Sequence, residues 1–233
     1  MGDIKGGRIM GTVHILPDTT KLPITKIGMA ASVCWGANID DESKYYQRGM
    51  DCIKSGHGRA FEFVNVEMIL EGYSARVIRE WYTHIGGAPT RLQESTRYIN
   101  YGKFEYVLPE SIQHKSSALY EYKNIMRDIG TVIRDLEGMG IPREDAAMLL
   151  PLGMTTTIVD KRNLRNLIDM SRQRMCNRAY WEFRELFRDI SIALTNYSEE
   201  WGWVVNNCFH AKCDESRTCS EKRGCGKYAK AGE

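Results

Sequence analysis

The sequence lacks several features that would assign it to other protein classes. No apolar run reaches 18 of its 233 residues, so no membrane-spanning helix is expected. The net charge is only +2, which implies no general attraction to nucleic acid or to a membrane surface. Residues 1–5 lack the apolar core of an export signal, so a reduced, cytoplasmic setting is expected. Because the net charge is so small, any anion-binding site must come from a local group of cationic or donor residues.

Two catalytic patterns are also missing. No Gly-x-Gly-x-x-Gly fingerprint occurs, which argues against a Rossmann oxidoreductase. No convincing Cys–His pair stands in the central part of the chain, so a covalent enzyme nucleophile is not indicated. With 42% hydrophobic and 27% charged residues, the chain suits one α/β domain with a sizeable core.

Hydrophobic periodicity predicts alternating strands and helices. Strands are predicted at residues 11–16, 61–70, 99–111 and 155–159. Helices are predicted from Asp40 or Asp41 to about 55, and at 74–84, 112–137, 163–174 and 179–197, with another beginning near Pro142. Ser74 is expected to cap the second of these. In the first, one side is expected to carry Tyr45, Tyr46, Met50 and Ile53. The helix at 74–84 is expected to turn Val77, Ile78 and Trp81 inward, and the helix at 163–174 to turn Leu164, Leu167, Ile168 and Ser171 inward.

A polar stretch follows the helix at 74–84. The breaker Gly86-Gly87-Ala88-Pro89 ends that helix. Next comes a dense set of polar side chains: Thr90, Arg91, Gln93, Glu94, Ser95, Thr96 and Arg97. Guanidiniums, hydroxyls and backbone N–H groups after a turn suit a phosphate monoester. The alternative is a solvated polar loop.

This stretch resembles the signature of flavin-dependent thymidylate synthases, in a variant with a longer loop. His84 fits the central histidine of the signature, and residues 95–98 (Ser-Thr-Arg-Tyr) fit its end. Thr83 and Ile85 stand where the family usually has two arginines, and the interval from His84 to Arg97 is two residues longer. Leu92-Gln93 stands where Asn-Glu is usual.

Further segments resemble the same family. Gly56-His57 followed by Phe61-Glu62 fits Gly-His-x-x-x-Phe-Glu, and Arg174 is separated by four residues from Ala179-Tyr180-Trp181-Glu182. By this resemblance, Arg174 lies against the uracil ring and is the catalytic residue. Substrate-binding positions are then Glu80, Gln93, Glu94, Ser95, Thr96, Arg97 and Arg174. Flavin or nucleotide contacts are His57, Thr83, His84, Ile85, Gln93, Asn163 and Asp169, where Asp169 replaces a common asparagine.

The resemblance also implies a reaction and an assembly. The enzyme would convert dUMP to dTMP, with a methylene group from methylenetetrahydrofolate and a hydride from reduced FAD, which NADPH regenerates. The implied fold is α/β (α+β): a single domain with a central, mostly antiparallel sheet flanked by helices. The implied assembly is a homotetramer. We expect a catalytic domain at 1–205, a Cys-rich tail at 206–233, no membrane or nucleic-acid partner, and no metal.

Two alternatives remain open at this stage. A related enzyme could hydroxymethylate a pyrimidine nucleotide instead of methylating it. The tail could form a zinc-dependent nucleic-acid-binding module, since Cys208, Cys213, Cys219, Cys225 and His210 lie among basic residues. Because the spacings are not the usual two-residue knuckles, exposed or partner-contacting thiols are the other interpretation of the tail.

Overall fold

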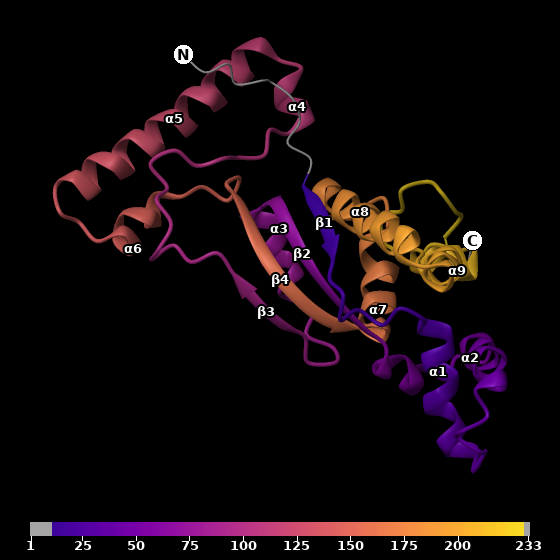
Figure 1. Cartoon of the computed structure of the whole chain (residues 1–233). Coiled ribbons are helices and arrows are strands. Elements are labelled where there is room, and N and C mark those ends of the chain that lie inside the picture. Colours follow the sequence, from indigo (N-terminus) through magenta and orange to yellow (C-terminus); the bar gives the residue numbers. More distant parts are fainter. Residues whose placement is uncertain (1–10, 231–233) are drawn as a thin grey trace. The chain divides into compact units, whose positions relative to one another are not determined.

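The computed structural model describes residues 11–230 (Figure 1). Its strands are β1 (Thr12–Ile15), β2 (Asn65–Ser74), β3 (Thr90–Gln93) and β4 (Thr155–Asn163). Its helices are α1 (Pro23–Ser32), α2 (Tyr45–Lys54), α3 (Ala75–Trp81), α4 (Glu110–Gln113), α5 (Ser116–Gly138), α6 (Arg143–Ala146), α7 (Leu164–Arg174), α8 (Trp181–Tyr197), α9 (Glu199–Cys208) and α10 (Lys212–Ser216). Short 3-10 helices are η1 (Val33–Trp35), η2 (Glu42–Lys44), η3 (Gly58–Phe63) and η4 (Ala147–Leu149).

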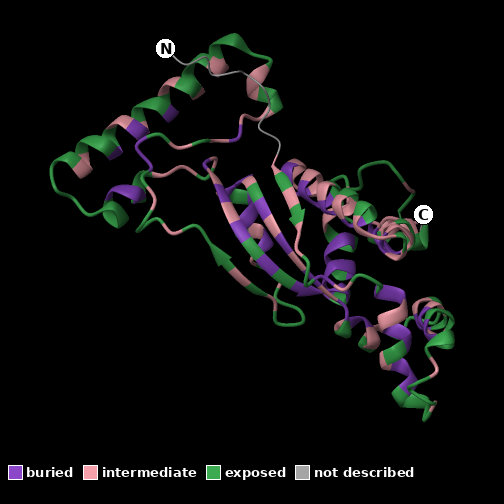
Figure 2. Ribbon diagram, in the orientation of Figure 1, coloured by how far each residue is buried: buried purple, intermediate pink, exposed green. Residues whose placement is uncertain are grey.

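The four strands form one sheet in the order β1-β2-β4-β3. β2 and β4 run antiparallel, because Leu164 N donates to Val64 O at one end of the pair and Ala75 N donates to Met154 O at the other. Buried residues alternate with more exposed ones along both strands (Figure 2). This alternation is typical of a strand with one face on a core. The predicted mixture of helices with an antiparallel sheet is confirmed.

Internal contacts divide the chain into two compact units, and the boundaries fall within strands. The described residues of unit 1 are 11–12, 70–83 and 92–158. Those of unit 2 are 13–69, 84–91 and 159–230. The predicted boundary after residue 205 falls within α9, and that division into a domain and a tail stays a prediction.

Unit 1 has its own apolar core beneath α5. Tyr101, Ile133, Ala146 and Met154 are buried together, and partly buried side chains of α5 pack around them. At the end of β2, Ser74 Oγ accepts a hydrogen bond from Val77 N at 3.2 Å, which caps α3 as predicted. α3 then buries Val77, Ile78 and Trp81, also as predicted.

Unit 2 combines a close helix pair with a larger helical core. In α1 and α2, Gly28 and Gly49 face the backbone of the opposite helix so closely that no side-chain carbon would fit at either position. α7 buries Leu164, Leu167, Ile168 and Ser171, the face that the periodicity predicted. α8 adds Phe183, Leu186, Phe187, Ile190 and Leu194.

Some predicted elements are wrong or shifted. The segment 99–111 is not a strand: it runs as turns with one isolated antiparallel bridge between Tyr106 and Met154, and α4 begins at Glu110. Asn100 Oδ1 accepts from Gly102 N at 2.9 Å, and this local turn interrupts an extended course. β2 begins at Asn65, after η3, and not at 61. Tyr46 is exposed, whereas its neighbour Tyr45 is buried, so the two do not share one buried side of α2 as predicted.

None of the helices within residues 11–230 has the length and apolar character that a membrane crossing requires.

Candidate functional site

The predicted substrate-binding stretch of unit 1 is anchored to β4. Gln93 Nε2 donates to Thr156 Oγ1 at 3.2 Å, and Glu94 Oε2 accepts from Thr157 N at 2.9 Å. A turn follows, in which Ser95 Oγ accepts from Arg97 N at 3.3 Å. These bonds tie the Gln93 and Glu94 side chains to β4. Their predicted substrate contacts therefore compete with a structural role.

Arg97 and Thr96 stand on the exposed side of this turn. The Arg97 Nε lies 2.6 Å from Glu144 Oε2, with side chains that are 66% and 51% exposed. Exposed ion pairs of this kind contribute little to stability, so a phosphate group could exchange with the Glu144 carboxylate at low cost. The other two predicted positions in unit 1 lie at the end of α3, where Thr83 Oγ1 donates to Glu80 O at 2.7 Å.

In unit 2, the loop at 84–91 lies on the N-terminus of α7. Gly87 has φ +72°, and a side chain there would collide with the amide of Asn163. Asn163 Oδ1 also accepts from Asn166 N at 2.9 Å, which makes Asn163 the N-cap of α7. Asn163 thus joins the loop to the helix, a role that its predicted flavin contact did not include. Ile85, on the same loop, is 69% exposed.

His84 and Arg174 meet directly in unit 2. Arg174 Nε donates to His84 Nε2 at 2.9 Å, and its guanidinium carbon lies 4.6 Å from the centre of the Phe183 ring. Because Nε2 accepts this bond, the neutral imidazole carries its proton on Nδ1. Two residues that are 90 positions apart in the sequence therefore form one hydrogen-bonded pair. In this pair, the neutral imidazole ring orients the half-buried guanidinium.

The pKa of His84 is lowered from 6.5 to about 4, first by burial and then by the positive charges of Arg174 and Arg162. At neutral pH the imidazole is therefore uncharged and can accept the Arg174 hydrogen bond. Protonation would place two cations in contact and remove the acceptor.

This lowered pKa predicts a pH-dependent stability. Between pH 6.5 and about 4 the unfolded chain protonates His84 while the folded chain does not, so the free energy of unfolding should fall as the pH falls through this window. Above pH 6.5 this contribution should be complete and constant. Urea denaturation from pH 4 to 8 measures it, and His84→Gln should flatten the part of the slope due to this residue. An equal slope in both proteins would contradict the assignment.

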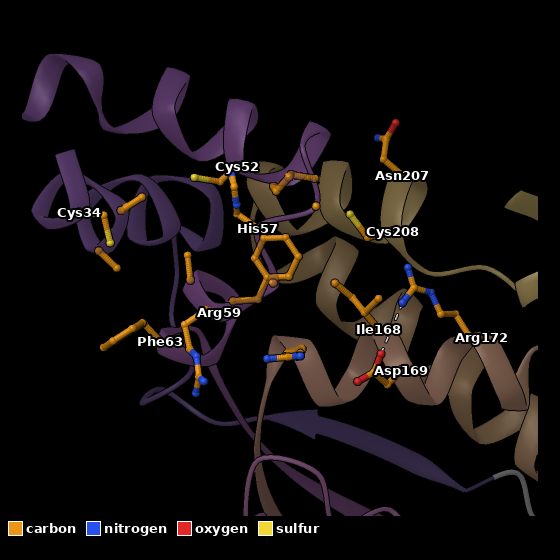
Figure 3. A pocket seen from close by; sticks show the side chains of 18 of the residues that line it. Cys34, Cys52, His57, Arg59, Phe63, Ile168, Asp169, Arg172, Asn207 and Cys208 are labelled. Atoms are coloured by element: carbon orange, nitrogen blue, oxygen red, sulfur yellow. Dashed lines mark hydrogen bonds and ion pairs between the residues drawn. The ribbon is translucent and has the colours of Figure 1, made fainter.

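A cavity of about 750 Å³ lies entirely within unit 2 (Figure 3). Its wall includes the predicted residues His57 and Asp169. Three arginines and three aromatic residues also line it: Arg59, Arg165, Arg172, Trp35, Phe61 and Phe63. This volume is in the range of pockets that bind small ligands and cofactors.

Glu62 holds two of the cavity arginines. Its carboxylate lies 2.6 Å from Arg165 Nη1 and 3.3 Å from Arg59 Nη1. The hydrogen bond from Arg165 is the main cause that lowers the pKa of Glu62. The donor set of guanidiniums, imidazole and aromatic rings fits a flavin nucleotide, which combines phosphates with a planar heterocycle.

The sequence interpretation missed several residues of this region. Arg165 and Arg172 were not assigned, although Arg165, Ile168, Asp169 and Arg172 fall at i, i+3, i+4 and i+7 on α7 and so share one face. It also missed the pair of Asp160 and Arg162, whose side chains are both fully buried. The helical spacing could have revealed the first group, whereas no sequence signal marked the second.

The cysteines of the tail show no metal-binding arrangement in the described part of the chain. Within residues 11–230, no group of three or more His, Cys, Asp or Glu side chains is placed to hold a metal ion. Burial raises the pKa of the Cys208 thiol to about 11, so this thiol is protonated at neutral pH.

Comparison with known proteins agrees with the resemblance. The family model described as thymidylate synthase complementing protein (Thy1) matches residues 16–195. A flavin-dependent thymidylate synthase of Nitratidesulfovibrio vulgaris is 28% identical over 189 residues, covering 76% of this chain and 74% of the relative. One from Pyrococcus abyssi is 32% identical over 184 residues, covering 73% and 74%. One from Clostridium tetani is 24% identical over 247 aligned positions, covering 96% of both chains.

These matches define an enzyme of the methyltransferase type. Because the family model covers well over half of the sequence, the chain belongs to the flavin-dependent thymidylate synthase family.

Proposed function

We propose that this protein methylates dUMP to dTMP, taking a methylene group from methylenetetrahydrofolate. Bound FAD, kept reduced by NADPH, would supply the hydride. We further propose that it acts as a homotetramer. The observation that carries the proposal is the His84–Arg174 pair, which lies within the segment that the family model matches.

Arg174 would act on the uracil ring. A cation beside the ring favours the ionised form of its N3 and raises the electron density at C5, the carbon that is methylated. A guanidinium held in a half-buried site by His84 and Phe183 does this more strongly than one in water, because less solvent screens its charge. The neutral imidazole orients the guanidinium without adding a competing charge.

The turn at 95–97 would bind the phosphate of dUMP. Arg97 offers a planar set of donors, and the Ser95 and Thr96 hydroxyls add to it. Since Arg97 is paired with Glu144 across an exposed surface, the substrate would displace that carboxylate. Gln93 and Glu94 would keep the turn attached to β4.

The unit 2 cavity would hold the flavin. His57 and the aromatic residues would contact its ring system, and Arg59 and Arg165 would face its phosphates. Glu62 would keep these two arginines in place.

The test is a purified full-length protein and a labelled substrate. The protein should be yellow, and it should release tritium from C5-labelled dUMP only when methylenetetrahydrofolate and NADPH are both present. Mass spectrometry of the nucleotide separates a methyl from a hydroxymethyl product. A colourless protein that FAD does not reconstitute would remove the proposed function.

A further inference from the structure

Part of the cavity wall comes from outside the segment that the family model matches. That match ends at residue 195, yet Asn207, Cys208, His210 and Glu215 line the cavity (Figure 3 shows the first two). These residues lie in or beside α9 and α10, and they belong to the same unit as the rest of the wall. The part of the chain after residue 195, called the C-terminal segment below, therefore contributes to the cavity wall.

Glu215 connects this segment to α7. Its Oε1 accepts from Arg172 Nε at 3.0 Å and lies 2.8 Å from His210 Nε2. Burial raises the pKa of Glu215, but the hydrogen bonds from His210 and Arg172 outweigh it, so the net shift is downward. The carboxylate is thus charged at neutral pH, and it fixes one side of the Arg172 guanidinium.

The other side of Arg172 faces Asp169. Arg172 Nη1 lies 3.5 Å from Asp169 Oδ1, and Figure 3 shows both side chains in the cavity wall. The Asp169 side chain is 56% exposed. An uncompensated carboxylate in this position would repel an anionic ligand, and the guanidinium beside it offsets that repulsion.

Building on the proposed function, we propose that Arg172 is a positioning residue of the flavin cavity. It neutralises Asp169 so that the cavity accepts the phosphates of FAD, and Glu215 and His210 of the C-terminal segment hold it there. The ligand class is an anionic flavin nucleotide. The affinity for riboflavin, the neutral parent compound, should not depend on this arrangement.

In the first test, flavin is titrated into the flavin-free, full-length protein, and binding is measured by the change in flavin fluorescence. Arg172→Gln should weaken FAD binding about tenfold, because Asp169 and Glu215 then lack their cation. The affinity for riboflavin should stay near the wild-type value. Adding Asp169→Asn to Arg172→Gln should restore most of the FAD affinity, because it removes the repulsive charge.

The second test addresses the C-terminal segment. Glu215→Gln removes a negative charge, and this loss by itself would strengthen the binding of an anionic ligand. Weaker FAD binding in this variant would therefore point to a displaced cavity residue, Arg172 or His210, and the Arg172→Gln background separates the two. We expect several-fold weaker FAD binding from Glu215→Gln when Arg172 is present, and no weakening in the Arg172→Gln background.

Glu221→Gln is the matched control for the second test. It removes a carboxylate of the same segment that lies 3.5 Å from Arg178, a residue outside the cavity wall, and it should leave FAD binding unchanged. Thermal unfolding should be the same for all variants, because the ion pairs concerned are largely exposed.

The outcomes separate this inference from the proposed function. Three results would each overturn the role of Arg172. They are an unchanged FAD affinity in Arg172→Gln, an FAD affinity that Asp169→Asn does not restore, and a loss of riboflavin affinity as large as the loss of FAD affinity. Glu215→Gln that binds FAD as tightly as the wild type, or more tightly, overturns the anchoring by the C-terminal segment. A wild-type protein that binds no FAD overturns the proposed function and this inference together.

Discussion

Replacing Arg174 with glutamine is expected to lower kcat for dUMP methylation by about 10²–10³-fold, the usual loss when a preorganised charge-stabilising donor is removed. The reason is electrostatic: glutamine can still accept or donate a hydrogen bond near His84, but it brings no positive charge to the uracil ring. Tritium release from C5-labelled dUMP measures the change. Flavin binding should be affected much less, since Arg174 is not part of the cavity wall.

The matched control for this prediction is Arg188→Gln. Arg188 is an exposed arginine on α8 with no assigned role, and its replacement should leave kcat unchanged. A kcat in Arg174→Gln within threefold of the wild type would remove Arg174 from the chemistry. An equal loss in Arg188→Gln would show that general charge, and not the position of Arg174, decides the rate.

Replacing Arg162 with methionine is expected to lower the free energy of unfolding by about 3–5 kcal/mol, the usual cost of removing one partner of a buried ion pair. Arg162 Nε and Nη2 bind the two Asp160 oxygens at 2.6 and 2.8 Å, and both side chains are fully buried. A third contact joins Arg162 Nη1 to Asn166 Oδ1 at 2.6 Å. The substitution therefore removes the guanidinium that offsets the charge of a carboxylate in the protein interior. Urea denaturation at pH 7 measures the loss.

The double variant Asp160→Leu/Arg162→Met tests the cause. It removes both charges and should recover much of the stability, because no charge of the pair then remains in the protein interior. If the double variant were as unstable as Arg162→Met alone, lost packing and the lost Asn166 contact, and not the uncompensated charge, would explain the effect. The exposed pair of Lys161 and Glu67 offers a contrast, since Lys161→Met should change stability by no more than about 1 kcal/mol.

Several features that depend only on residues close together in the sequence were predicted correctly. Ser74 followed by Val77, Ile78 and Trp81 predicts both a cap and a buried helical face, and both are present. The strand predicted at 99–111 failed because its apolar and aromatic residues serve a turn-rich segment packed against α5, and composition alone does not separate these cases.

The site divides in the same way. His84 and Arg174 could be singled out from motif spacing, but their 2.9 Å contact and the lowered pKa of His84 depend on groups brought together by folding. The predicted convergence of Arg97 and Arg174 on one nucleotide stays a prediction, since these residues belong to different units.

The sequence by itself determined the family, the helical faces and the identity of the candidate site residues, because these depend on residue type and on short, regular spacing. The tertiary structure alone decided that Glu215 reaches Arg172 from 43 positions away and that Arg162 lies buried against Asp160. Charge pairing acts through space and is strengthened by burial, and neither distance nor burial between remote segments is encoded in local periodicity.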